Sequence, residues 1–169
     1  MKKYLPALVA GFSAGVLHIV PIAKSLTCCL VVPIAAYFAI TLAAKSENII
    51  GNFNLKRGAM LGFLTGLFAA FFGSFFDIFI TFLTRSNDIL DAFNELNNMV
   101  DNFPVTQEIK DEVLNLMQNV ADSIREKGFS SLYAISIIFN NLIVDSIFGL
   151  IGGLVGTKFY NSKKSGIKS

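Results

Sequence analysis

The stretch that decides the fold is Gly58–Thr84, GAMLGFLTGLFAAFFGSFFDIFITFLT, in which 27 residues contain one charged side chain, Asp77. A helix of this length is about 40 Å long at ~1.5 Å rise per residue, whereas the apolar core of a bilayer is ~30 Å thick. A soluble protein of this size has no need for an apolar helix of that length. The stretch therefore predicts a membrane-spanning helix.

Small residues in this stretch recur at a helical spacing. Six positions fall within about 120° of one another around a helix; they are Gly58, Gly62, Gly66, Ala70, Gly73 and Asp77. Lipid tails are as apolar as Leu or Phe, so membrane helices associate largely through the close backbone approach that small residues permit. We therefore expect this stripe, with Asp77 on it, to face other helices.

The remaining apolar stretches predict three further membrane helices, over about residues 4–20, 25–44 and 131–160. Pro33 is expected to kink the second of them. Small and polar residues again share one face in the first and last helices: Gly11, Gly15 and His18 in the first, and Asn141, Asp145, Gly149, Gly152 and Gly156 in the last. The predicted fold class is all-α, a single membrane domain over residues 1–169 with four transmembrane helices.

The composition agrees with a membrane protein. Of 169 residues, 53% are hydrophobic, 17 are Phe, and the mean hydropathy is +0.59. The net charge of +2 is too small to indicate nucleic-acid binding. The two cysteines, Cys28 and Cys29, are adjacent, so they are not expected to form a relaxed disulfide with each other and are interpreted as apolar filler.

The basic residues predict the orientation. With the N-terminus in the cytoplasm, nine Lys and Arg residues fall on the cytoplasmic side and five on the other. The positive-inside rule then places both termini in the cytoplasm of a cell inner (plasma) membrane. On the outer side, residues 86–128 have the apolar spacing of two amphipathic helices, and residues 85–128 carry nine acidic and four basic side chains. We expect an acidic helical cap over the bundle.

Four polar residues are expected inside the membrane. Counted from the basic residues at the cytoplasmic edge, His18, Asp145, Asn141 and Asp77 lie about 22, 20, 26 and 30 Å deep. One hypothesis makes them a proton or cation site. The other makes them interhelical hydrogen bonds that fix which helices meet, and it is favoured because such polar contacts are common in membrane bundles.

The chain resembles an uncharacterised family of small four-helix bacterial inner-membrane proteins, known only as a domain of unknown function. The matching features are the Lys-rich start, the Gly-spaced span Gly58–Gly73, the acidic insertion Asp88–Glu126, the sequence Phe148-Gly149-Leu150-Ile151 and the Lys-rich tail. The resemblance implies membrane location and a bundle fold, and no activity.

No catalytic motif or metal-spaced His/Cys cluster is present in the sequence, so neither enzymatic activity nor a cofactor is expected. The expected function is that of an accessory or self-associating membrane subunit, with membrane lipid and a second copy or a membrane-complex protein as partners. The alternative is a small proton or cation transporter or channel that uses Asp77, Asp145 and His18.

Overall fold

The computed structural model describes residues 3–20, 26–87, 90, 100, 102 and 104–166. The elements in these residues are all helical: α1 (Leu5–Leu17), a π-helical turn (Thr27–Val31), α3 (Val32–Ser46), α4 (Leu55–Thr84), α7 (Gln107–Lys127) and α8 (Ser131–Gly166). The chain forms two compact units, one of residues 1–77 and 137–169 and one of residues 78–136. The long helices α4 and α8 run through both.

Three helical segments of the described residues are long and apolar enough to cross a membrane: Cys29–Ser46, Leu55–Thr84 and Ser131–Lys164. The first helix is shorter than expected. It ends at Leu17, after 13 residues, and so reaches only about 20 Å. Residues 18–20 are wound more tightly, because each donates its N–H to the carbonyl three residues back, for instance Val20 to Leu17 at 3.2 Å. Pro21 follows directly, and proline disfavours the α conformation in the residue before it.

The second helix also differs from the expectation. It was predicted to be one helix with a kink at Pro33, but a π-helical turn at Thr27–Val31 precedes the α-helix, and Pro33 lies in the first turn of α3. A proline is tolerated at that place because the first N–H groups of a helix have no partner within it. The helix therefore changes from π-helical to α-helical just before Pro33.

In the first unit, α4 and α8 approach each other through glycines on both helices. A Cβ placed on Gly62 would lie 2.6 Å from the Cα of Gly153, and a Cβ on Gly149 would lie 2.9 Å from the Cα of Gly66. The contact continues to Gly58, where an added Cβ would meet the side chain of Thr157. Only hydrogen side chains fit at these positions, so the two backbones touch.

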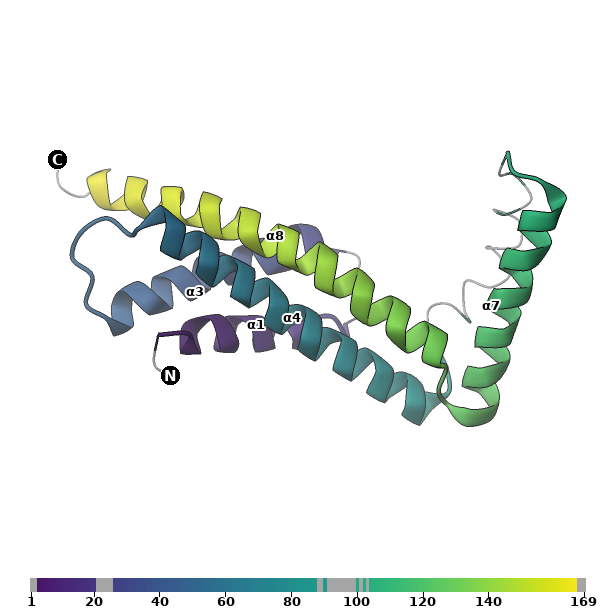
Figure 1. Ribbon diagram of the computed structural model, residues 1–169. Coiled ribbons are helices and arrows are strands. Elements are labelled where there is room, and N and C mark those ends of the chain that lie inside the picture. The colour runs from purple at the N-terminus through teal and green to yellow at the C-terminus, as the bar shows by residue number, and fades with distance from the viewer. Residues whose placement is uncertain are drawn as a thin grey trace. The chain divides into compact units, whose positions relative to one another are not determined.

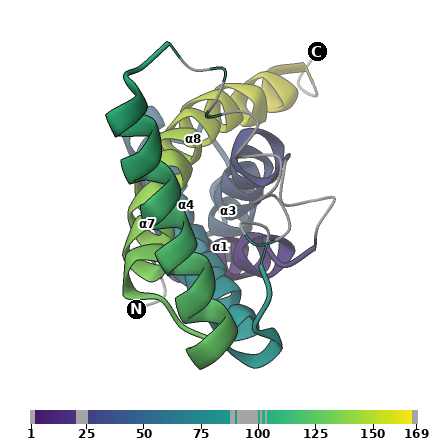
Figure 2. The ribbon, with the colours of Figure 1, turned by 90° about the vertical axis from the view of Figure 1, so that its right-hand side faces the viewer.

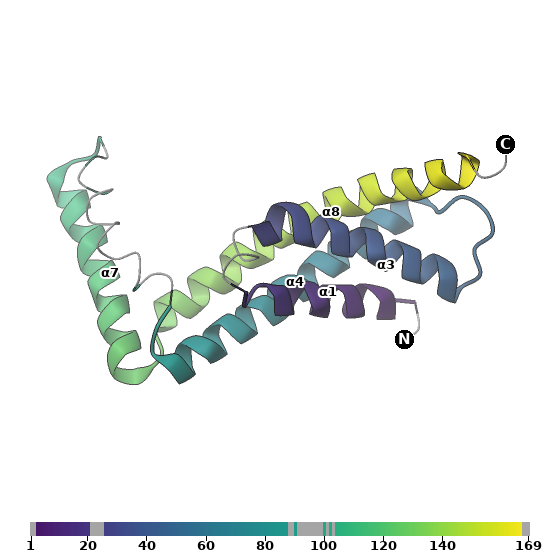
Figure 3. The ribbon, with the colours of Figure 1, turned by 180° about the vertical axis from the view of Figure 1, so that it is seen from behind.

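The helices α1 and α3 complete the first unit and lie side by side in Figures 1 and 3. In Figure 2, which is turned by 90°, α1 and α3 are again adjacent. An added Cβ on Gly15 would lie 2.7 Å from the Cβ of Phe72, so α1 also packs against α4. The core between these helices is rich in alanine: Ala10, Ala14, Ala35, Ala39 and Ala69. Small side chains thus bring three helices close together.

The small residues of α8 face two neighbours. Gly149 and Gly153 contact α4, whereas Gly152 and Gly156 contact α3. A Cβ added to Gly152 would lie 2.8 Å from the carbonyl oxygen of Pro33, and one added to Gly156 would lie 3.2 Å from the Cα of Tyr37. The sequence was interpreted as giving one stripe that included Gly149, Gly152 and Gly156. The structure divides that stripe between two helices.

The second unit contains α7 and the ends of α4 and α8 nearest to it in sequence. The apolar residues Val120, Ala121 and Ile124 of α7 are buried. The helix ends at Gly128, which has a positive φ of 71° and donates its N–H to the Ile124 carbonyl at 2.8 Å. The other helix expected in the insertion falls mostly on residues 88–101, of which the structure describes only 90 and 100.

Candidate functional site

The polar cluster in the first unit is built around His18 and Asp145. The Nε2 atom of His18 lies 3.3 Å from the Oδ2 atom of Asp145. Both side chains are buried: that of Asp145 is 1% exposed and that of His18 is 10% exposed. Neither atom makes a geometrically good hydrogen bond within the described part of the chain. The contact is therefore a close approach of an acid and a base whose hydrogen-bonding geometry is imperfect.

Two glycines of α4 create the room for this contact. A Cβ on Gly73 would lie 2.9 Å from the Cγ atom of His18, so the imidazole packs on bare backbone. A Cβ on Gly66 would lie 3.0 Å from the Cα of Ser146, next to Asp145. The close approach of α4 and α8 at Gly66 places the Asp145 carboxylate where the C-terminal end of α1 brings His18.

A second interhelical contact lies one turn along α8. The amide nitrogen of Asn141 donates a hydrogen bond to the Ser74 hydroxyl of α4 at 3.0 Å. Ser74 is buried, and the buried hydroxyl of Ser146 has no hydrogen-bond partner among the described residues. Asp77 is half-buried on α4, three residues beyond Ser74. Two contacts of the cluster thus join helices: His18 lies against Asp145, and Asn141 is hydrogen-bonded to Ser74.

The sequence interpretation omitted Ser74, Ser146 and Gly153. Ser74 could have been found from the sequence by its depth. It lies 17 residues after Arg57, and thus at a depth of about 26 Å, which is the depth expected for Asn141. Gly153 could have been found too, since it lies four residues after Gly149.

The opposite end of the first unit, where α1 and α4 begin and α3 and α8 end, is basic. We call it the basic end; its cations are Lys3, Lys45, Lys56, Arg57, Lys158, Lys163 and Lys164. One acid lies among them. Glu47 accepts two hydrogen bonds from the Arg57 guanidinium, one of them at 2.6 Å from Nη1. This hydrogen bonding, with the charges of Arg57 and Lys3, holds the pKa of Glu47 below its usual value.

The loop at this end is tied to α8 by side chains. Asn161 accepts from the Phe53 N–H at 2.7 Å and donates to the Phe53 carbonyl at 3.0 Å. The ammonium of Lys164 donates to the Ile49 carbonyl at 2.6 Å. These bonds fix the start of α4 against the end of α8.

The groups of the buried cluster can hold a proton and can join helices through polar contacts. It offers one imidazole, one fully buried carboxylate, an amide and two hydroxyls. Among the described residues, no group of three His, Cys, Asp or Glu side chains is arranged to hold a metal ion. The cluster connects α1, α4 and α8 at one level of the bundle.

The chain matches no protein-family model, no curated protein and no solved structure. The resemblance to a family of small inner-membrane proteins therefore stays a prediction.

Proposed function

We propose that the chain is an integral protein of the inner (plasma) membrane, with four membrane helices and both termini in the cytoplasm, and that it acts without catalysis as a self-associating or accessory subunit. The apolar helices and the basic end support the membrane placement. For the short α1, support comes from its exposed residues, which are apolar as a lipid-facing surface requires: Leu5, Val9, Phe12 and Val16.

One observation carries the self-association. The glycine faces of α1, α4 and α8 are occupied by contacts within the chain, but small residues also line a groove between α1 and α3 that stays open. This groove has a volume of about 630 Å³; its small lining residues are the exposed Ser13 and the buried Ala10, Ala14 and Ala35, and its other lining residues are larger side chains such as Phe38. Small residues in such a groove permit the close approach of a further helix. We assign the groove to a helix of a second copy.

The test is resonance energy transfer between C-terminally labelled copies in lipid vesicles, measured over a range of protein-to-lipid ratios. Ser13→Leu fills the groove from an exposed position, and Ser136→Leu makes the same change at an exposed position of α8. We expect transfer for the wild type and the control and its loss in Ser13→Leu. Transfer that never exceeds the level of random proximity, or that is unchanged in Ser13→Leu, contradicts self-association through the groove.

Proton or cation transport is the second candidate, and the His18–Asp145 contact favours it. A carboxylate that is 1% exposed and whose Oδ2 accepts no hydrogen bond from the described residues is costly to keep charged inside a membrane, and an adjacent imidazole is a group that can exchange a proton with it. Asp77 would add a second acid on α4. The same contact equally supports an interhelical tie.

Flux in proteoliposomes separates these roles. Asp145→Asn removes the buried carboxylate, whereas Asp122→Asn makes the same change on the exposed face of α7. Flux of the wild type above that of empty liposomes, lost only in Asp145→Asn, would establish transport. If the wild type shows none and Asp145→Asn unfolds more readily, the contact is a structural tie.

A further inference from the structure

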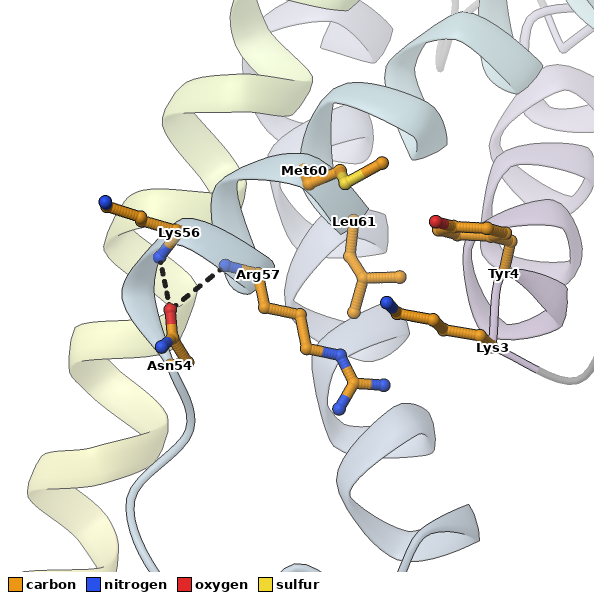
Figure 4. A pocket seen from close by; sticks show the side chains of 7 residues that line it. All are labelled: Lys3, Tyr4, Asn54, Lys56, Arg57, Met60 and Leu61. Carbon is orange, nitrogen blue, oxygen red and sulfur yellow. Dashed lines mark hydrogen bonds between the residues drawn. The ribbon is translucent and has the colours of Figure 1, made fainter.

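A hollow at the basic end lies between the start of α1 and the start of α4. Its volume is about 330 Å³, and we call it the basic pocket (Figure 4). Its lining residues are Lys3, Tyr4, Asn54, Lys56, Arg57, Met60 and Leu61. It is remote in sequence from the polar cluster and uses none of its residues.

The rim of the basic pocket is positively charged. In Figure 4 the ammonium of Lys3 and the guanidinium of Arg57 point toward the same space, whereas the exposed side chain of Lys56 extends from the rim away from that space. Glu47 neutralises one of these three cations through its hydrogen bonds to Arg57. The surplus of two positive charges calls for an anionic occupant.

This charge comes from side chains and not from the start of a helix. The backbone N–H groups of Lys56 and Arg57, in the first turn of α4, already have an acceptor. Both donate to the side-chain oxygen Oδ1 of Asn54, at 2.9 and 3.3 Å. The ammonium groups of Lys3 and Lys56 are thus the exposed donors left for a ligand, and the Nε–H of Arg57 is a buried donor without a hydrogen-bond partner among the described residues. Lys3 also lies over the Tyr4 ring, 5.7 Å from its centroid.

The walls of the basic pocket are apolar. Met60 and Leu61 follow Arg57 along α4 and form one wall, and the Tyr4 ring lies across the pocket from them (Figure 4). A free phosphate ion would leave these walls without an apolar partner. A phospholipid satisfies both parts, since its phosphate matches the cations and its glycerol and first methylene groups match the walls.

The position of the basic pocket agrees with such a ligand. Leu55–Thr84 is apolar enough to span a membrane, and the pocket lies at its beginning, where the phosphates of one leaflet are expected. Other cations of the basic end, among them Lys158 and Lys163, lie outside the pocket. The basic pocket thus differs from the rest of the basic end because apolar side chains line it beside the cations.

We propose that the basic pocket binds one anionic phospholipid, with its phosphate beside Lys3 and the Arg57 guanidinium, Lys56 adding positive charge at the rim, and its apolar part against Met60 and Leu61. This inference rests on the membrane placement of the bundle and is independent of self-association and of transport.

The test is native mass spectrometry of the detergent-purified protein with added phosphatidylglycerol, phosphatidylcholine or inorganic phosphate. The variant Lys3→Gln/Lys56→Gln removes the two free cations of the pocket. The control Lys158→Gln/Lys163→Gln removes the same charge from exposed positions elsewhere on the basic end. Loss of one lysine near an anionic lipid lowers affinity by about 5-fold, so the double pocket variant should bind phosphatidylglycerol about 25-fold more weakly.

We expect the control and the charge-preserving Lys3→Arg/Lys56→Arg to retain the bound phosphatidylglycerol. Three results would overturn the proposal: equal binding of phosphatidylcholine, an equal loss in the control pair, or binding of inorganic phosphate as strong as that of phosphatidylglycerol. The last result would assign the pocket to a free anion. Because the readout is lipid binding by single copies, it does not depend on the outcome of the energy-transfer or flux experiments.

Discussion

Substituting Gly62 by alanine should destabilise the first unit, because its α-hydrogen faces backbone. The added Cβ would lie 2.6 Å from the Cα of Gly153, about 0.8 Å short of the 3.4 Å at which ordinary contact begins. The atoms that the Cβ would meet belong to the main chain of Gly149 and Gly153. No side chain can therefore rotate away, and α4 and α8 must separate. A gap of 0.5–1 Å already forfeits roughly a quarter to a half of a van der Waals contact.

The expected net effect follows from two opposing terms. Overpacking costs about 1–3 kcal/mol, and the better helix propensity of alanine returns up to ~1 kcal/mol. We therefore expect Gly62→Ala to lower the free energy of unfolding by about 1–2 kcal/mol. The assay is unfolding in mixed micelles, followed through the near-ultraviolet circular dichroism of the four tyrosines.

Gly51→Ala is the matched control, because an added Cβ there meets nothing within 4 Å. It should change stability by less than about 0.5 kcal/mol. The reasoning is refuted if Gly62→Ala is as stable as the wild type, or if both alanine variants lose the same amount.

Three further predictions concern single positions. Asn54→Ala removes the side-chain acceptor at the start of α4 and should cost about 1 kcal/mol in the same unfolding assay. Gly128→Ala forces a Cβ into the left-handed region at φ 71° and should cost about 1–2 kcal/mol, whereas Gly128→Asn should cost less. The lowered pKa of Glu47 means that its bond to Arg57 stabilises the fold above the ordinary Glu pKa of 4.5 and that this contribution is lost as the pH falls through the lower pKa of the folded state. Glu47→Gln should therefore be less stable than the wild type by under about 1 kcal/mol at neutral pH, with the difference vanishing in acid.

The depth of a residue along a membrane helix could be predicted from the sequence, because the rise per residue of an α-helix is constant. His18 and Asp145 were placed at about 22 and 20 Å from the basic edge, and the structure brings them into contact. The helical class and the long apolar helices were also predictable from hydropathy. Three points stay predictions: the orientation of the chain in a membrane, the number of four spanning helices, and every functional role.

The sequence could not predict which neighbouring helix each face of α8 contacts. On a helix, Gly152 and Gly153 lie on opposite sides of Gly149, about 60° and 40° away from it. These angles do not say where the neighbouring helices stand. In the structure the boundary between the faces toward α3 and α4 falls between Gly152 and Gly153. A pattern in one helix therefore predicts a packing surface without predicting how many helices share it.

The contact between His18 and Asp145 depends on the glycines of α4. The His18 imidazole can reach Asp145 because Gly73 offers it bare backbone, and Asp145 is brought in because α8 touches α4 at Gly66. A loss of function in Asp145→Asn would thus leave open whether charge or helix placement mattered. Gly73→Ala resolves this, because it keeps both titratable groups but displaces the imidazole through a Cβ that would lie 2.9 Å from its Cγ atom. If the pair carries protons, flux falls in Gly73→Ala although the acid and the base remain; if it only joins helices, stability alone falls.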